Sequence, residues 1–222
     1  MSRTVRTGLV IALAAGVAGA GLLWAPAASA QNAAHNHIGH VMDKWNDTPD
    51  MAGLLPAAIA EARIAAAHAG FAARDLSDLD AMKLHSAHVL HAVDPSQIEG
   101  GPGQGYGVRR AAEGAAKHIM AAANSDGASG AVKAHAEHVA TSAQNSVTRA
   151  DEIVMLAQKI AMVDSAADAA PLVTELNELA QALLAGVDAN EDGRVGWQEG
   201  EGGLDQVEQH VGLLARGEGL SD

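Results

Sequence analysis

Hydrophobic positions recur every three or four residues along most of the chain, and no segment alternates apolar and polar positions. The first pattern is typical of amphipathic helices, whereas alternation would indicate strands. Clusters of glycine, proline and aspartate fall between the periodic stretches, where they end helices. The pattern therefore predicts an all-α protein with helices at residues 35–46, 52–74, 78–93, 106–124, 128–163, 166–187 and 197–215.

Composition determines how these helices can pack. Only 2% of the residues are aromatic, so the core must be built from Ala, Leu, Val, Ile and Met. Small side chains fill space only where backbones approach closely, which predicts an Ala-rich helical bundle. The glycine-rich segment 99–107 follows no strand and lacks the lysine of a phosphate-binding loop, so we interpret it as a flexible linker.

The first 30 residues have the pattern of an export signal. Arg3 and Arg6 precede an apolar run at 8–23, and Ala28-Ser29-Ala30 is typical of a cleavage site. The alternative is an uncleaved membrane anchor, but the run is rich in glycine and alanine and therefore weak. There is no cysteine to carry a lipid or a disulfide. We expect a periplasmic or secreted protein without a stable membrane anchor, beginning near Gln31.

Signal removal makes an acidic chain more acidic. It takes away two of the 14 basic residues and none of the 27 acidic ones, which leaves a net charge of −15. Nucleic acid and anionic membranes are therefore poor partners, and cations or basic proteins are better ones. The remaining length suits one domain or a domain with an appendage. We expect a helical bundle at 31–165 and a helix-loop-helix at 166–222, packed on the bundle or continuous with it.

Oxygen-bearing groups follow a regular spacing in residues 188–199. With Asp188 as position 1, the side chains at positions 3, 5 and 12 also carry oxygen, and the carbonyl at position 7 completes the set. A calcium loop uses these positions, with glycine at position 6 for the sharp turn. Gly193 stands there. The expected calcium ligands are Asp188, Asn190, Asp192, Arg194 and Glu199.

With leucines and valines at helical spacing on both sides, residues 171–214 resemble the EF-hand family. The resemblance implies a single C-terminal helix-loop-helix that binds Ca²⁺ through the ligands named above. EF-hands usually occur in pairs, and no second intact loop is found. The unpaired loop suggests either a homodimer or a weak structural site where calcium is millimolar. Trp197 lies inside the loop, so its emission should report calcium binding.

Histidine supplies the second candidate chemistry. Six of the eleven histidines form a repeated phrase, His-x-x-His-Val, at 37–41, 85–89 and 135–139. Residues three apart are neighbours on a helix, so each phrase can direct two imidazoles at one volume. Imidazole is a ligand for copper, zinc, nickel, iron and haem iron. The candidates for a second metal or haem site are His37, His40, His85, His88, His118, His135 and His138.

Helical-wheel angles place four of these histidines beside apolar faces. They are His37, His85, His118 and His135. A cluster of these four between packed helices would be a nitrogen-rich metal site, or could include the axial pair for a haem. The second members of the phrases, His40, His88 and His138, are farther from the core. The remaining histidines that lack a pattern, His68, His91 and His210, are interpreted as surface residues. The alternative is that the histidines at helix seams hydrogen-bond to backbone or acidic groups and hold no metal.

Motifs for catalysis are missing from the sequence. It has no cysteine nucleophile, no Gly-x-Ser-x-Gly elbow, no His-Glu-x-x-His phrase and no Glu-x-x-His pair. The first interpretation is an exported, non-catalytic calcium-binding protein. The second is a cell-envelope bundle that binds a transition metal or b-type haem, for metal handling or electron transfer. The third is a structural or partner-binding bundle that calcium stiffens.

Overall fold

The computed structural model describes Met1 and residues 25–220, with side chains from residue 33 onward. The described part is all-helical, which confirms the predicted fold class. Most of the expected signal segment, residues 2–24, lies outside the described residues. Among the described helices, none is long and apolar enough to span a membrane. The elements are α1 (Ala25–Met42), η1 (Pro49–Met51), α2 (Leu54–Ala72), α3 (Leu79–Val93), η2 (Pro95–Gln97), α4 (Val108–Ala123), α5 (Gly130–Met162), α6 (Ala166–Ala185) and α7 (Leu204–Glu218).

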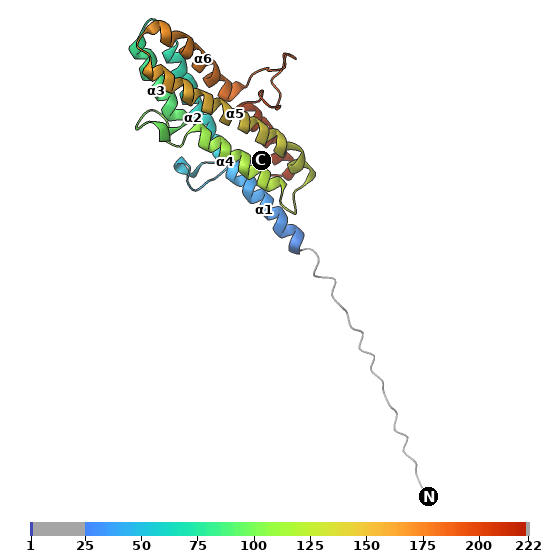
Figure 1. Cartoon of the computed structure of the whole chain (residues 1–222). Coiled ribbons are helices and arrows are strands. Elements are labelled where there is room, and N and C mark those ends of the chain that lie inside the picture. Colours follow the sequence, from blue (N-terminus) through green and yellow to red (C-terminus); the bar gives the residue numbers. More distant parts are fainter. Residues whose placement is uncertain (2–24, 221–222) are drawn as a thin grey trace.

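Helix α5 organises the bundle. It has 33 residues, runs along most of the bundle and contacts α3, α4, α6 and α7 (Figure 1). Helix α2 packs against α3, α4 and α6, while α1 lies against α4. One hydrophobic cluster includes buried residues from all seven helices. The predicted C-terminal helix-loop-helix therefore shares its core with the bundle.

Alanine makes this close packing feasible. Helix α2 buries seven alanines in its contacts with neighbouring helices. Larger side chains such as Ile38, Met82 and Ile119 fill the remaining space and are fully buried. The end of α1 meets the start of α2 so closely that a Cβ on Gly53 would lie 2.4 Å from the Met42 carbonyl carbon. Glycine is therefore required at that crossing.

Side-chain caps determine where several helices begin. The Asp78 carboxylate accepts the backbone N–H of Ala81 at 2.9 Å at the start of α3. The Ser129 hydroxyl accepts two N–H groups at the start of α5, and Ser165 caps α6. Each cap satisfies donors that a helix leaves without internal partners. These residues explain why the predicted starts of the three helices agree with the structure to within two residues.

The glycine-rich segment 99–107 is held on the bundle, in contrast to the expected flexible linker. The Glu61 side chain projects from α2 and is fully buried. Its Oε1 accepts the backbone N–H groups of Gln104, Tyr106 and Gly107 at 3.1, 3.0 and 3.2 Å. Tyr106 is buried as well. The segment thus has a carboxylate anchor that its own sequence does not reveal.

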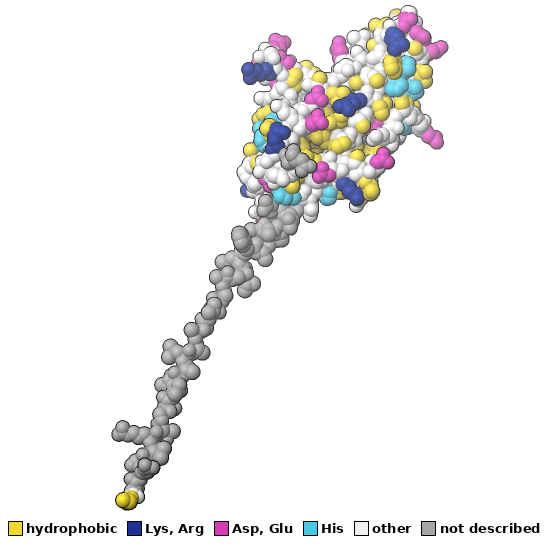
Figure 2. Space-filling view, turned by 180° about the vertical axis from the view of Figure 1, so that it is seen from behind, with side chains coloured by type: hydrophobic (Ala, Val, Ile, Leu, Met, Phe, Trp, Pro, Cys, Tyr) yellow, Lys and Arg dark blue, Asp and Glu magenta, His cyan; other side chains and the backbone are white. Residues whose placement is uncertain are grey.

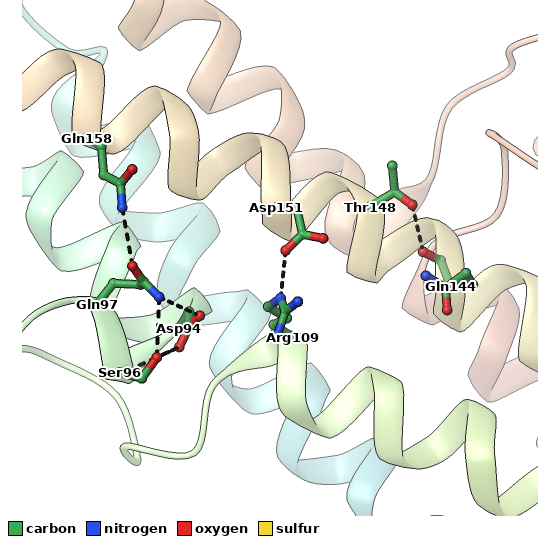
Figure 3. A network of polar contacts seen from close by, with 8 residues as sticks. All are labelled: Asp94, Ser96, Gln97, Arg109, Gln144, Thr148, Asp151 and Gln158. Atoms are coloured by element: carbon green, nitrogen blue, oxygen red, sulfur yellow. Dashed lines mark hydrogen bonds and ion pairs between the residues drawn. The ribbon is translucent and has the colours of Figure 1, made fainter.

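Polar contacts on the surface connect α5 to its neighbours (Figure 3). Arg109 on α4 donates to the Asp151 carboxylate at 2.6 Å, and the Gln158 amide donates to Gln97 on η2 at 3.2 Å. Both contacts are solvent-exposed, so each contributes only modestly to stability. The bundle therefore depends chiefly on its buried apolar contacts.

Helix α7 begins at Leu204, later than the predicted start at residue 197. The reason is a clamp from α5. The Arg149 guanidinium donates to the carbonyls of Gly200, Glu201 and Gly202 at 2.6–2.8 Å. The Asn145 amide also binds the segment, by donating to the Gln198 carbonyl and accepting the Gly200 N–H. These contacts hold residues 198–202 against α5 in a non-helical conformation. The first half of the loop projects from the bundle (Figure 1).

Candidate metal centres

Nine of the eleven histidines gather into three separate groups. Triad 1 is His37, His40 and His118, triad 2 is His68, His85 and His88, and triad 3 is His135, His138 and His210. In each triad the ligand atoms lie within 4.8 Å of one another, and every member is half-buried. Figure 2 shows histidine side chains in separate patches of one face. Each triad has the donor number that a metal centre requires.

All three triads share one geometry, in which Nδ1 atoms converge. The His118 Nδ1 lies 3.0 Å from the His37 Nδ1 and 3.3 Å from the His40 Nδ1. In triad 2 the His68 Nδ1 is 3.2 Å from both partners. In triad 3 the corresponding distances from the His210 Nδ1 are 3.3 and 3.4 Å.

Each triad is built on a pair of packed helices. One helix supplies the His-x-x-His phrase and the other supplies a single histidine: α1 with α4, α3 with α2, and α5 with α7. The valine that ends each phrase, Val41, Val89 or Val139, is fully buried. Since successive residues point about 100° apart on a helix, that anchor holds both imidazoles at the margin of the core. The repeated phrase is therefore a repeated site.

Hydrogen bonds between the imidazoles do not satisfy all three nitrogens of a triad. A neutral imidazole nitrogen offers either one in-plane lone pair or one N–H. The central Nδ1 of each triad can therefore pair well with one of its two close neighbours. A single cation would accept all three lone pairs. For a four-coordinate ion with metal–nitrogen bonds of about 2.0–2.1 Å, ligand nitrogens lie about 3.3–3.4 Å apart. The observed separations of 3.0–3.4 Å are close to that spacing.

The surroundings lower the pKa of six of these nine imidazoles. Burial lowers the pKa of His118, and the nearby positive charge that His40, His37 and Lys117 would carry lowers it further. Burial and then the neighbouring triad histidines likewise lower the pKa of His68 and of His210. The same two causes, burial first, lower the pKa of His40, His88 and His138. A neutral imidazole has the free lone pair that a metal needs.

An aromatic ring lies beside every triad. The Trp45 ring centroid is 4.7 Å from that of His40 and 4.6 Å from that of His118. Phe71 lies 5.4 Å from both His68 and His85. Trp197 stacks on His138 at 4.0 Å with an interplanar angle of 22°. Each ring covers part of its triad with apolar surface.

The four seam histidines do not form a single cluster. Only His37 and His118 come together, while His85 joins triad 2 and His135 joins triad 3. Helical-wheel angles give the direction of a side chain around a helix but not its height along the bundle. His40, His88 and His138, expected to lie farther out, complete the triads. They do so because each partner histidine approaches between the two members of a phrase.

His68 and His210 are ligand candidates that the sequence interpretation missed. Both were expected on the surface, yet each is the central member of its triad. When His35 and His91 are left out, phrases and single histidines alternate along the chain in the order 37/40, 68, 85/88, 118, 135/138, 210. His91 is buried rather than exposed, and its Nδ1 bonds to the Pro102 carbonyl oxygen at 2.9 Å.

The predicted calcium ligands lie in the loop between α6 and α7. The Asp188 carboxylate accepts the backbone N–H groups of Asp192 and Gly193 at 3.1 and 2.8 Å. The Asn190 and Asp192 side chains accept N–H groups two residues onward. Among the described residues, the acidic side chains of this loop form no group of three whose ligand atoms lie within 4.8 Å of one another. The buried acid here is Glu201, which accepts the Gly196 N–H at 2.8 Å.

Fold and site together define a helical bundle whose histidine clusters could hold metal ions. Comparison with family models, with curated proteins and with solved structures finds no match for this chain. Its function must therefore be inferred from its own residues.

Proposed function

We propose that this protein is a non-catalytic, transition-metal-binding helical bundle with three tri-histidine centres. The observation that carries the proposal is the convergence of nine Nδ1 atoms in three sets with the same construction. Each set has the same donor type and lies on its own pair of helices. Apolar packing of the bundle does not require three such sets. Borderline metals such as copper, zinc and nickel accept imidazole nitrogen, so they are the expected ions.

The geometry favours a bare ion over haem. A haem iron takes its two axial imidazoles from opposite sides of a flat macrocycle. In each triad the central Nδ1 instead lies 3.0–3.4 Å from the Nδ1 atoms of both partners, which leaves no room for a macrocycle between them. The alternative without metal, seam histidines bonded to acids or carbonyls, fits His35 and His91. It does not fit the triads, whose near neighbours are other histidines.

The proposal extends to location and role. Residues 1–30 have the pattern of an export signal, so we place the protein in the periplasm or outside the cell. Three equivalent-looking centres on one small chain suit metal handling, in which capacity matters, rather than electron transfer.

Metal content gives the direct test. We expect the metal-free protein to bind three equivalents of a transition-metal ion per chain, measured by elemental analysis after gel filtration. Replacing the central histidine of one triad, by His118→Ala, His68→Ala or His210→Ala, should remove one equivalent each, because two imidazoles hold an ion much less firmly than three.

The control variant replaces a histidine that lies outside the triads. His35 bonds to Glu218 through its Nε2 and belongs to none of the triads, so His35→Ala should retain three equivalents. Circular dichroism of every variant should show an unchanged helix content. Full metal binding by the three central variants, or none by the unaltered protein, would contradict the proposal.

Calcium in the 188–199 loop is the second candidate function. The supporting observation is that the Asp188, Asn190 and Asp192 side chains fold the first half of the loop around their own backbone N–H groups. Oxygens gathered in this way suit a hard cation. Among the described residues, Asp188, Asp192 and Glu199 do not form a group with ligand atoms within 4.8 Å of one another, so calcium binding by all three would require the loop to rearrange.

We therefore expect one calcium ion to bind weakly per chain. Titration calorimetry at millimolar calcium should detect the heat of this binding. Asp188→Ala combined with Glu199→Gln should abolish that heat, while the three transition-metal equivalents remain. Glu191→Gln, which changes an exposed loop acid outside the predicted ligand set, serves as control. A flat titration of the unaltered protein up to several millimolar calcium would rule out this second function.

A further inference from the structure

The absence of an acidic ligand from the triads indicates which class of ion they bind. This inference rests on the proposed function. The groups contain histidine alone, so among the described residues no carboxylate completes any of the three. A centre with three neutral ligands carries the full charge of its ion. Zinc or cupric ion would leave two positive charges there, and a cuprous ion would leave one.

Partial burial makes that difference important. The cost of moving an ion out of water rises with the square of its charge, so a divalent ion pays about four times the cost of a monovalent ion of the same size. Glu137 opposes the penalty at His138 of triad 3, but no carboxylate belongs to any of the three described groups, which favours the lower charge.

One aromatic residue lies against the histidine rings of each triad. Four aromatic residues lie in the part of the chain whose side chains are described, and three of them, Trp45, Phe71 and Trp197, each contact a different triad. An aromatic ring attracts a cation through its π face and excludes water. In a chain with so few aromatics, this distribution is not explained by core packing.

We propose that the triads are sites for a monovalent coinage-metal ion, Cu(I), and that Trp45, Phe71 and Trp197 are parts of these sites that favour Cu(I) over divalent ions. Such a d¹⁰ ion accepts nitrogen ligands and needs only two to four of them. Ag(I) has the same charge and similar preferences, and it serves as an air-stable probe. The rings raise affinity for the monovalent ion without adding a ligand.

Competition between ions tests the proposal. Metal-free protein is titrated anaerobically with Cu(I) against the chelator bathocuproine disulfonate, and separately with Zn(II) against pyridylazoresorcinol. We expect three equivalents of Cu(I) that a tenfold excess of Zn(II) does not displace, and three of Ag(I). Three equivalents of Zn(II) that exclude Cu(I) would overturn the inference and leave the proposed function standing. Binding of neither metal would overturn both.

Variants of the rings test their role. Trp45→Leu and Trp197→Leu should each weaken Cu(I) binding at one centre by about two- to tenfold and leave Zn(II) binding unchanged. The Arg74 guanidinium already lies 5.0 Å from the Phe71 ring centroid, so Phe71→Leu should have the smallest effect. Equal losses of Cu(I) and Zn(II) affinity would mean that the rings act only through packing, which would overturn their assigned role.

Discussion

Replacing Glu61 with alanine should destabilise the protein by about 3–5 kcal/mol, because three backbone N–H groups, two of them buried, lose their common acceptor. The N–H groups of Gln104, Tyr106 and Gly107 all donate to Oε1. Leaving one such donor without a partner costs about 1–3 kcal/mol, more when the lost acceptor was charged. Urea unfolding followed by circular dichroism would measure the change in unfolding free energy. Segment 99–107 should become sensitive to proteolysis in the same variant.

Two further variants separate the anchor from a general loss of charge. Glu178 is exposed on α6, so Glu178→Ala should change stability by less than about 0.5 kcal/mol. Glu61→Gln keeps an acceptor oxygen in place and should cost less than the alanine variant. If Glu61→Ala unfolded at the same urea concentration as Glu178→Ala, the carboxylate would not be the anchor of this segment.

The helices could be predicted from sequence because each is specified locally. Hydrophobic period, caps such as Asp78 and Ser165, and breaks at proline and glycine all act over a few residues. The start of α7 could not be found in this way. It depends on Arg149 and Asn145, which lie about fifty residues earlier in the chain and bind the carbonyls that a helix would use. Glu61 affects segment 99–107 through a similar long-range contact.

The sequence predicts the pairing of two members of each triad but not how the third joins them, because only the first two are specified locally. The phrases place two histidines on one helix face, a local fact that the spacing shows directly. The third member comes from another helix, and its height depends on how the two helices slide against each other. His118 has a lysine before it and His210 a glutamine, so neither differs locally from a surface histidine. The assembly of a triad is therefore a property of helix packing.

That dependence on packing leads to the second large effect. Gly53→Ala should remove the metal ion of triad 1, although it changes no ligand. A Cβ at this position would lie 2.4 Å from the Met42 carbonyl carbon and 2.5 Å from its oxygen, both backbone atoms that cannot rotate away. The end of α1 must shift, which moves His40 and Trp45 relative to His118. Metal sites tolerate displacements of only about 0.5 Å, so we expect two bound equivalents in place of three.

Gly70→Ala is the matched control, since a Cβ there would meet no atom within 4 Å. Gly70 lies on α2 only two residues from His68, yet this variant should retain three equivalents and gain roughly 0.5–1 kcal/mol of stability from a better helix former. Elemental analysis of both variants, with Trp45 emission as a local probe, decides the outcome. Three equivalents in Gly53→Ala would show that triad 1 does not depend on the close crossing of α1 and α2. Two equivalents, with triads 2 and 3 unaffected, would show that backbone contact at one glycine sets the height of the imidazoles on α1.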